Sequence, residues 1–314
     1  MKKLLLLVMV LVLIGLAGCG ETAKQPQSLK VAVLPVLDVL PLYVAEAEGY
    51  FEKNGVMVEL VPVGSAPERD QLMQAGQIDG MLTELVVTLL YNREAPKITI
   101  VRFARVATAE YPLFRILASK QSGISQPQDL KGVPIGVSDL TVIEYTTDRM
   151  LEKAGLNKDE IAKISVPKIP DRLALLDSGE LKAANLPDPV ASVAIQNGAM
   201  VVIDDTSTPE ISNSVYAFSN ESIKYKPQAV RAFLKAVEQA VSAINSDKSR
   251  WNTLLADKKL VPPTVLAGYT LPDFPRASAP SRDQFNDALA WVQSKGVVGQ
   301  AVPYESCVDA SLLP

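Results

Sequence analysis

Residues Leu29 to Gly64 read LKVAVLPVLDVLPLYVAEAEGYFEKNGVMVELVPVG, and this stretch decides the fold. Leu29–Leu34 alternates apolar and polar residues around valines, which predicts a strand, and Pro35 ends it because proline has no amide donor. Pro41 suits the first turn of a helix, and Val56–Val61 predicts a second strand. Two strands joined by a helix run parallel, which leaves the loop after the first strand open to a ligand.

Two motifs in and after this stretch resemble those of a known family. Residues 41–64, PLYVAEAEGYFEKNGVMVELVPVG, and residues 76–80, GQIDG, resemble the opening signature of substrate-binding proteins of ABC importers. The branch is the nitrate, sulfonate, taurine and thiamine-precursor (NMT1/THI5-like) family. The resemblance extends to the chain end, YESCVDASLLP, and its motifs are specific to the family but not to one ligand. It implies an α/β protein of the type II periplasmic-binding fold, with two α/β lobes joined by two crossing strands.

Composition limits the classes of function. The 314 residues suit roughly two domains, and a net charge of −4 argues against nucleic-acid binding. The sequence has no histidine, which removes Ser-His and Cys-His nucleophile pairs and the commonest metal ligand. Cys19 and Cys307 can form neither a disulfide framework nor a cysteine zinc site. We therefore expect no metal, no cofactor and no enzymatic activity.

The first residues predict a targeting signal. Met1-Lys2-Lys3 precedes a short apolar run, and Leu16-Ala17-Gly18-Cys19 resembles a bacterial lipobox. We expect a signal peptide at 1–18, lipidation of Cys19 and a polar tether at 19–28, which place the protein outside the cytoplasm on a membrane lipid anchor. The alternative is an ordinary signal peptide with a chance cysteine. The sequence leaves open whether the membrane is the inner or the outer one.

The rest of the chain alternates strands and helices, which is typical of an open α/β sheet. Ile98–Phe103 is an apolar run that predicts a buried strand of the parallel type. Chain crossings between lobes are predicted near Phe114–Ala118 and Val215–Phe218. With the resemblance, this gives lobe 1 at 29–117 and 213–314 and lobe 2 inserted at 118–212. Two linkers would permit hinge bending around a ligand.

The candidate ligand-binding residues follow predicted strands and begin predicted helices, where free backbone amides gather. They are Leu37, Asp38, Pro41, Gly64, Ser65, Ala66, Thr83, Glu84, Ser138, Asp139, Thr141, Asn185, Asp188 and Pro189. The alternative is that the hydroxyl residues among them merely cap their helices.

These loops carry four acids and no basic residue: Asp38, Glu84, Asp139 and Asp188. A sulfonate or nitrate site would want arginine or free amides without nearby carboxylates. The acids favour a solute that donates hydrogen bonds, such as an amine, an aminopyrimidine or another nitrogen heterocycle. Two alternatives stay open. The acids can be first-turn charges that face solvent, and Arg69, Arg105 or Arg172 can reach the site from elsewhere.

Three functions follow from these patterns. The first is a monomeric, lipid-anchored receptor that passes a small solute to ABC permease and ATPase subunits. It includes the alternative of an anion receptor for sulfonate, nitrate or taurine. The second is an enzyme of thiamine-pyrimidine metabolism on the same fold, although its family members use a histidine that this chain lacks. The third is a sensor, but we find no second signalling domain in this sequence.

Overall fold

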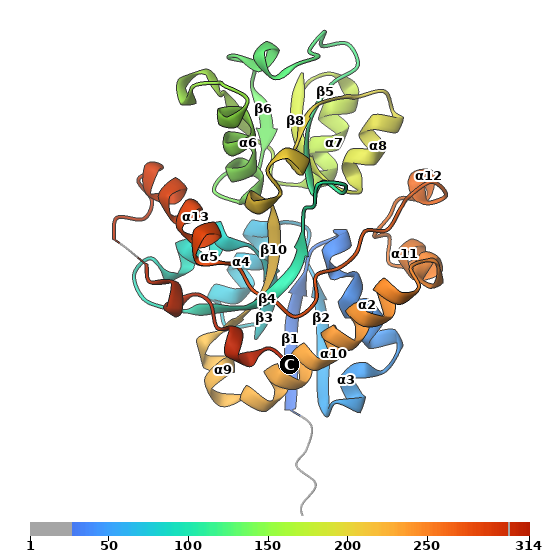
Figure 1. Ribbon diagram of the computed structural model, residues 1–314, viewed down its shortest axis with the longest axis vertical. Coiled ribbons are helices and arrows are strands. Elements are labelled where there is room, and N and C mark those ends of the chain that lie inside the picture. Colours follow the sequence, from blue (N-terminus) through green and yellow to red (C-terminus); the bar gives the residue numbers. More distant parts are fainter. Residues whose placement is uncertain (1–26, 301) are drawn as a thin grey trace, which may run out of the picture.

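The computed structural model describes residues 27–300 and 302–314. The predicted signal peptide, Cys19 and nearly all of the tether lie outside these residues. Two five-stranded sheets, each covered by helices, form two lobes stacked along the long axis of the molecule (Figure 1). Two lobes of class α/β were predicted, and this prediction is confirmed. Within the described ranges, we find no helix with the length and apolar character needed to span a bilayer.

Lobe 1 is built on a mixed sheet of strand order β2-β1-β3-β10-β4. Its strands are β1 (Gln27–Val33), β2 (Val56–Pro62), β3 (Gly80–Thr83), β4 (Ile98–Val106) and β10 (Asn213–Ser219). β1 pairs in parallel with β2 and β3, as the opening stretch predicts. The prediction of a parallel strand near Ile98 was wrong, because β4 is buried but pairs antiparallel with β10.

The helices of lobe 1 come from both halves of the sequence. They are α2 (Leu40–Ala47), α3 (Tyr50–Lys53), α4 (Ala66–Gln74), α5 (Leu85–Asn92), α9 (Asn220–Tyr225), α10 (Pro227–Ser246), α11 (Asn252–Asp257), α12 (Pro263–Leu266) and α13 (Arg282–Ser294). α10 buries one apolar face, and its Phe233 stacks on Phe51 with ring centroids 5.7 Å apart. The same ring meets Tyr216 and Phe218 of β10 edge-on. This aromatic cluster therefore packs α10, from the second half of the sequence, against α3, from the first half.

Lobe 2 has the strand order β7-β6-β8-β5-β9. Its elements are β5 (Phe114–Ala118), β6 (Ile135–Val137), α6 (Val142–Lys153), β7 (Lys163–Ser165), α7 (Ile169–Ser178), β8 (Ala183–Pro187), α8 (Val190–Gln196) and β9 (Met200–Asp204). Short 3-10 helices lie in both lobes, at Leu37–Val39, Pro127–Leu130, Lys158–Glu160, Asp205–Ser207, Pro209–Ile211, Ser249–Trp251, Tyr304–Ser306 and Ala310–Leu312.

The chain crosses between lobes at 107–113 and 205–212, between strands of different sheets. The crossings lie side by side: the Asp205 carboxylate accepts hydrogen bonds from the amides of Leu113 and Phe114, both at 2.9 Å. All of β5 belongs to the second sheet, so the structure moves the first lobe boundary from the predicted 117/118 to the segment before Phe114. Val215–Phe218 is likewise part of a lobe 1 strand rather than a crossing.

Candidate functional site

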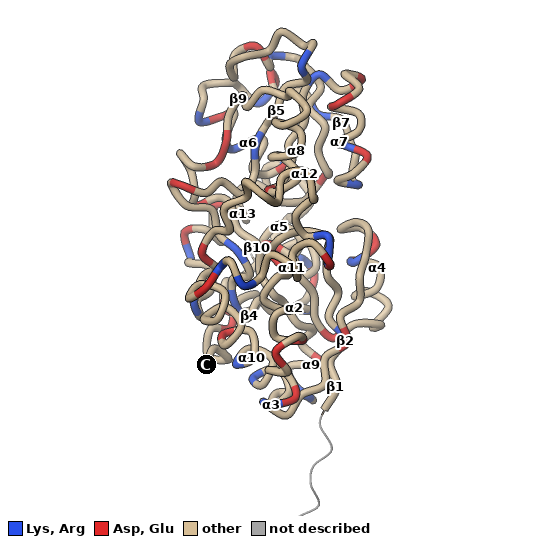
Figure 2. The backbone as a smooth tube through the Cα atoms, turned by 90° about the vertical axis from the view of Figure 1, so that its right-hand side faces the viewer, with Lys and Arg blue, Asp and Glu red and all other residues tan. Residues whose placement is uncertain are grey.

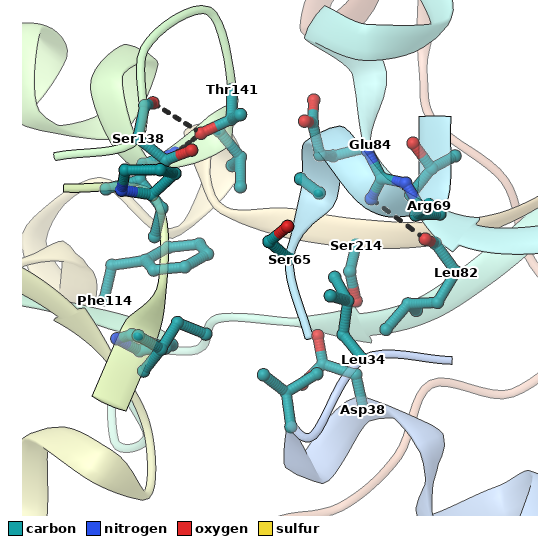
Figure 3. A pocket seen from close by; sticks show the side chains of 18 of the residues that line it. Leu34, Asp38, Ser65, Arg69, Leu82, Glu84, Phe114, Ser138, Thr141 and Ser214 are labelled. Carbon is teal, nitrogen blue, oxygen red and sulfur yellow. Dashed lines mark hydrogen bonds between the residues drawn. The ribbon is translucent and has the colours of Figure 1, made fainter. Parts of the chain in front are cut away.

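A cavity lies between the lobes, where the carboxyl ends of strands from both sheets face each other (Figure 3). Its empty volume is about 720 Å³, which includes the part open to solvent. In Figure 3, Ser138, Thr141 and Phe114 of lobe 2 face Ser65, Glu84 and Asp38 of lobe 1 across this space. The predicted residues that line it are Asp38, Gly64, Ser65, Ala66, Thr83, Glu84, Ser138, Thr141 and Asp188.

The other predicted residues do not line this cavity. Leu37 is fully buried in the lobe 1 core, and Pro41 is buried in the first turn of α2. Asp139 is exposed and lines a separate groove beside α4 and α5. The amide of Asn185 is turned inside lobe 2, where it donates to Thr146 and Thr147. Pro189 follows a cis peptide bond and precedes α8.

Most of the remaining lining is apolar and was not predicted. These residues are Leu34, Val36, Leu82, Leu113, Phe114, Val142, Ile143, Pro167, Ile169 and Pro187, joined by the polar Ser214. Arg69 and Arg172, named above as arginines that can reach the site from elsewhere, also line the cavity, whereas Arg105 does not. The unpredicted residues stand at strand ends, in a crossing and in first helical turns. They could have been predicted from their places in the sequence, beside the predicted loops. Side chains at the carboxyl ends of neighbouring strands lie along one edge of the sheet.

Three of the predicted polar residues cap helices that begin at the cavity. Ser65 caps α4 by accepting from the Glu68 amide, Glu84 caps α5, and Thr141 caps α6. Thr141 also donates its hydroxyl to the Ser138 carbonyl at 2.8 Å. The capping alternative, which concerned the hydroxyl residues, therefore holds for Ser65 and Thr141. It does not hold for Thr83 and Ser138, because α5 and α6 are capped by other residues. The result is that helix N-termini from both lobes point at one cavity, which suits a polar ligand group.

Two of the predicted acids are held by one buried arginine. Arg105, 2% exposed, lies with its Nη2 2.9 Å from Asp188 Oδ2 and its Nη1 3.5 Å from Asp38 Oδ1. Arg115 and the Tyr269 hydroxyl also contact Asp188. Burial alone lowers the pKa of Arg105, but Asp188, Tyr269 and Asp38 together raise that pKa above its ordinary value. These two carboxylates therefore have protein partners and are poor candidates for binding a ligand donor.

Glu84 differs from them. It is 5% exposed, and its Oε2 accepts a hydrogen bond from the Val87 amide at 3.0 Å. Its Oε1 is buried and has no hydrogen-bond partner within the described part of the chain. Burial raises the pKa of this carboxyl to about 7, and Arg69 together with the backbone amides of Val87 and Val142 offsets part of the rise. Near neutral pH, Glu84 can therefore accept a hydrogen bond when ionised and donate one when protonated.

A second polar contact joins the lobes away from the cavity. Lys295, which directly follows α13 in lobe 1, lies 2.8 Å from Glu144 and 2.7 Å from Asp148, both on α6 of lobe 2. The Trp291 indole also donates to Asp148, at 3.0 Å. Asp287 completes the contact by accepting from Arg149. Figure 2 shows α12 and α13 at the level where the lobes meet. The lobes are therefore held together by direct contacts on the α13 side.

Comparison with known proteins identifies the family. The family model described as "NMT1/THI5 like" matches residues 37–248, and the chain belongs to this family.

Two relatives indicate the range of its members. The formylaminopyrimidine-binding protein of Halalkalibacterium halodurans is 26% identical over 174 residues, 53% of this chain and 51% of that protein. The 4-amino-5-hydroxymethyl-2-methylpyrimidine phosphate synthase THI11 of Saccharomyces cerevisiae is 24% identical over 225 residues, 66% of this chain and 64% of that protein. The chain thus spans about half to two thirds of these relatives' length. One is named as a binding protein and the other as an enzyme.

Solved structures show the same fold. The alkanesulfonate-binding protein of Xanthomonas axonopodis pv. citri superposes with a TM-score of 0.75 at 18% identity, covering 91% of this chain and 99% of that one. The predicted periplasmic-binding-protein fold is confirmed, and the fold is that of ABC-type solute-binding proteins.

Proposed function

We propose that this protein is the extracytoplasmic solute-binding lipoprotein of an ABC importer. It captures a small solute between two hinged lobes and, as a monomer, delivers it to the permease and ATPase subunits. The observation that carries the proposal is a cavity with walls from both lobes. A solute seated there contacts both lobes at once, so its binding free energy favours their closed arrangement.

The solute that this site favours donates hydrogen bonds, as an amine or a nitrogen heterocycle does. Asp38 and Asp188 are engaged by Arg105, and Asp139 lies outside the cavity lining. The preference for a donor therefore rests on Glu84, whose Oε1 lacks a partner within residues 27–300 and 302–314. The apolar lining, with Phe114, suits a flat ring. The relative named as a formylaminopyrimidine-binding protein agrees with this chemistry.

The experiment is to identify what the protein carries. Mass spectrometry of protein purified without refolding should find a bound small molecule, and titration of that compound should give saturable binding near micromolar, about −8 kcal/mol. Small-angle scattering should show a smaller radius with solute than without it. A tight solute that leaves the radius unchanged contradicts the hinged mechanism.

An anion receptor of the same kind is the alternative that Arg69 and Arg172 support, since both line the cavity. The sulfonate-binding structural neighbour has the same fold. A thermal-shift screen in which sulfonates or nitrate alone stabilise the protein would select this alternative.

An enzyme of thiamine-pyrimidine metabolism is the candidate from another class. Glu84 favours it, because a carboxyl with a pKa of about 7 suits general acid-base catalysis, and one relative is named as a synthase. Against it, the whole sequence has no histidine. Chromatography of the identified solute after prolonged incubation decides the matter: a product that forms with wild type and not with Glu84→Gln establishes the enzyme.

The lipid anchor belongs to the same proposal and rests on the lipobox around Cys19. Labelled palmitate should enter the wild-type protein in living bacteria and not the Cys19→Ala variant. Cys307→Ala is the matched control, because that thiol is buried and should not change labelling. Label that persists in Cys19→Ala contradicts the anchor.

A further inference from the structure

Helices α4 and α7 occupy equivalent places in the two lobes. Each follows the outer parallel strand of its sheet, β2 or β7, and precedes a more central one, β3 or β8. Their first turns read Pro67-Glu68-Arg69 and Pro170-Asp171-Arg172. Each helix is followed by a glycine with a left-handed backbone, Gly76 at φ 66° and Gly179 at φ 82°. Equivalent positions in the two segments are always separated by the same number of residues, so the segments can be compared residue by residue.

The two arginines have the same setting. Arg69 is 1% exposed and Arg172 is 0% exposed, and both line the cavity. Arg69 donates to the carbonyl of Leu82 near the end of β3, at 3.1 Å. Arg172 donates to the carbonyl of Asn185 in β8, at 2.8 Å. Leu82 and Asn185 are themselves equivalent positions. Each guanidinium is therefore fixed beside the carboxyl end of its sheet.

The two sites differ in their counter-charge. Asp70 follows Arg69, and its Oδ1 lies 2.8 Å from both Nε and Nη2 of that guanidinium. The equivalent position after Arg172 is Leu173. No carboxylate within the described ranges lies within ion-pair distance of Arg172. The Nη2 of each arginine forms no hydrogen bond within these ranges, but that of Arg69 has the Asp70 carboxylate beside it and that of Arg172 has none. The Nη1 of Arg172 donates to the Val166 carbonyl at 2.6 Å. Burial, with no charged partner to offset it, lowers the pKa of Arg172 to about 10.

A buried arginine without a carboxylate is costly, because its charge loses water without gaining a partner. Protein interiors retain such a group where something else supplies the counter-charge. The fold makes room for it: a Cβ at Gly136 would lie 3.3 Å from Arg172 Cγ and 2.7 Å from Leu181 Cδ1, so glycine lets the arginine cross β6. The side chain of Arg172, which comes from α7, is therefore held in one conformation by its packing against β6.

We propose that Arg172 binds an anionic group of the solute, which supplies the counter-charge that Asp70 supplies to Arg69. This inference rests on the proposed function and narrows its ligand. The solute then carries an acid group at lobe 2 and a hydrogen-bond donor that meets Glu84 at lobe 1. Small amphoteric solutes, such as an aminated heterocycle with a carboxylate, fit both ends.

The test compares two probes of the same shape: 4-aminopyrimidine-5-carboxylate and its neutral carboxamide. Calorimetric titration of the wild type should give about tenfold tighter binding of the carboxylate, as expected for a charge-assisted pair. Leu173→Asp places a carboxylate where Arg69 has one, and should remove this preference. Leu173→Asn is the matched control, since it changes size and polarity without adding charge, and should keep it. Arg172→Gln should lose the preference as Leu173→Asp does.

The ratio between the probes separates a ligand contact from a purely structural role, because a loosened fold weakens both probes alike. Equal binding of both probes by the wild type overturns the inference, as does a preference that survives Leu173→Asp. Failure of the carboxylate to bind overturns it as well. The proposed function fails on a different observation, namely protein from its native cells that carries no small molecule. A neutral co-purified solute overturns the inference and leaves the receptor proposal intact.

Discussion

The Arg105 guanidinium in lobe 1 lies 2.9 Å from the Asp188 carboxylate in lobe 2, between residues 83 positions apart in the chain. The same guanidinium is 3.5 Å from Asp38, so one arginine holds acids from both lobes. Tyr269, also of lobe 1, adds a hydroxyl to Asp188. Separation of the lobes at the cavity must break these contacts. Residues in the wall of the cavity therefore also form contacts that hold the two lobes together.

The first prediction concerns this contact. Asp188→Asn removes the charge that faces Arg105 and Arg115 and leaves buried guanidinium groups with less compensation. Loss of one partner from a buried pair costs about 3 to 5 kcal/mol. Chemical denaturation should show a free energy of unfolding lower by about that amount, and scattering of the ligand-free protein should show a larger radius.

The control for this prediction is Asp139→Asn. Asp139, like Asp188, was predicted to bind the ligand, but it is exposed and does not line the cavity. Its replacement should change stability by less than about 0.5 kcal/mol. Equal effects of the two substitutions would contradict the role assigned to Asp188.

The second prediction is a pH dependence of stability. Burial raises the pKa of Glu84 from 4.5 to about 7, so the folded protein binds this proton more tightly than the unfolded chain does. The stabilisation is present in full below about pH 4.5 and is lost as the pH rises through about 7; it amounts to about 3 kcal/mol. Glu84→Gln keeps an acceptor for the α5 cap and should flatten stability curves across this range.

Two comparisons check this assignment. Asp205 has a pKa raised to about 6 by burial, so a weaker slope should remain in Glu84→Gln and should fall further when Asp205→Asn is added. Glu94→Gln should change nothing, because the Glu94 side chain is 74% exposed. A wild-type slope that survives in Glu84→Gln would place the titrating group elsewhere.

The third prediction concerns the space above Gly136. A methyl group there would lie 2.7 Å from Leu181 and 3.3 Å from the Arg172 side chain, so Gly136→Ala must displace one of them. We expect a loss of stability of about 1 to 3 kcal/mol from overpacking, together with weaker solute binding. Gly268→Ala is the control, since a Cβ there meets no atom within 4 Å. Unchanged solute affinity in Gly136→Ala would show that Arg172 tolerates displacement.

The fourth prediction concerns the contact between α13 and α6. Lys295→Met removes the ammonium between Glu144 and Asp148, which leaves Lys163 as their remaining cation among the described residues. Charge-assisted bonds of this kind contribute about 1.5 to 3 kcal/mol each when buried, and less here because Lys295 is 25% exposed. Denaturation midpoints should fall, and the difference from wild type should shrink in 1 M salt. A salt-independent loss would point to packing against Trp291 instead.

Much of the fold is predictable because local patterns and topology agree. The opening strand, helix and strand lie where Pro35, Pro41 and the valines place them. The 20-residue helix α10 begins at Pro227, and its buried apolar residues recur with the period of a helix. What the patterns could not supply is the direction of a strand in its sheet. An apolar run such as Ile98–Phe103 is equally suited to parallel and antiparallel neighbours when both faces are buried, and here the late strand β10 decides.

The candidate site was predictable as a set of loops and not as a set of contacts. Ser65, Glu84 and Thr141 could be placed at helix starts from sequence, and all three line the same cavity. The partners of Asp38 and Asp188 could not be placed, because Arg105 reaches them from the end of the edge strand β4 across a long sequence separation. Asn185 was a reasonable polar candidate, but its amide turned inward to neighbouring threonines.

The pairing of Asp205 with the amides of Leu113 and Phe114 has one further consequence. Because lobe 2 enters and leaves the rest of the molecule through adjacent points, residues 114–204 are an insertion with neighbouring ends. Such a segment can be exchanged between relatives as a cassette, with its two junctions cut at one place in space. Recombination or engineering could thereby replace one half of the binding surface while the half that carries Glu84 stays intact.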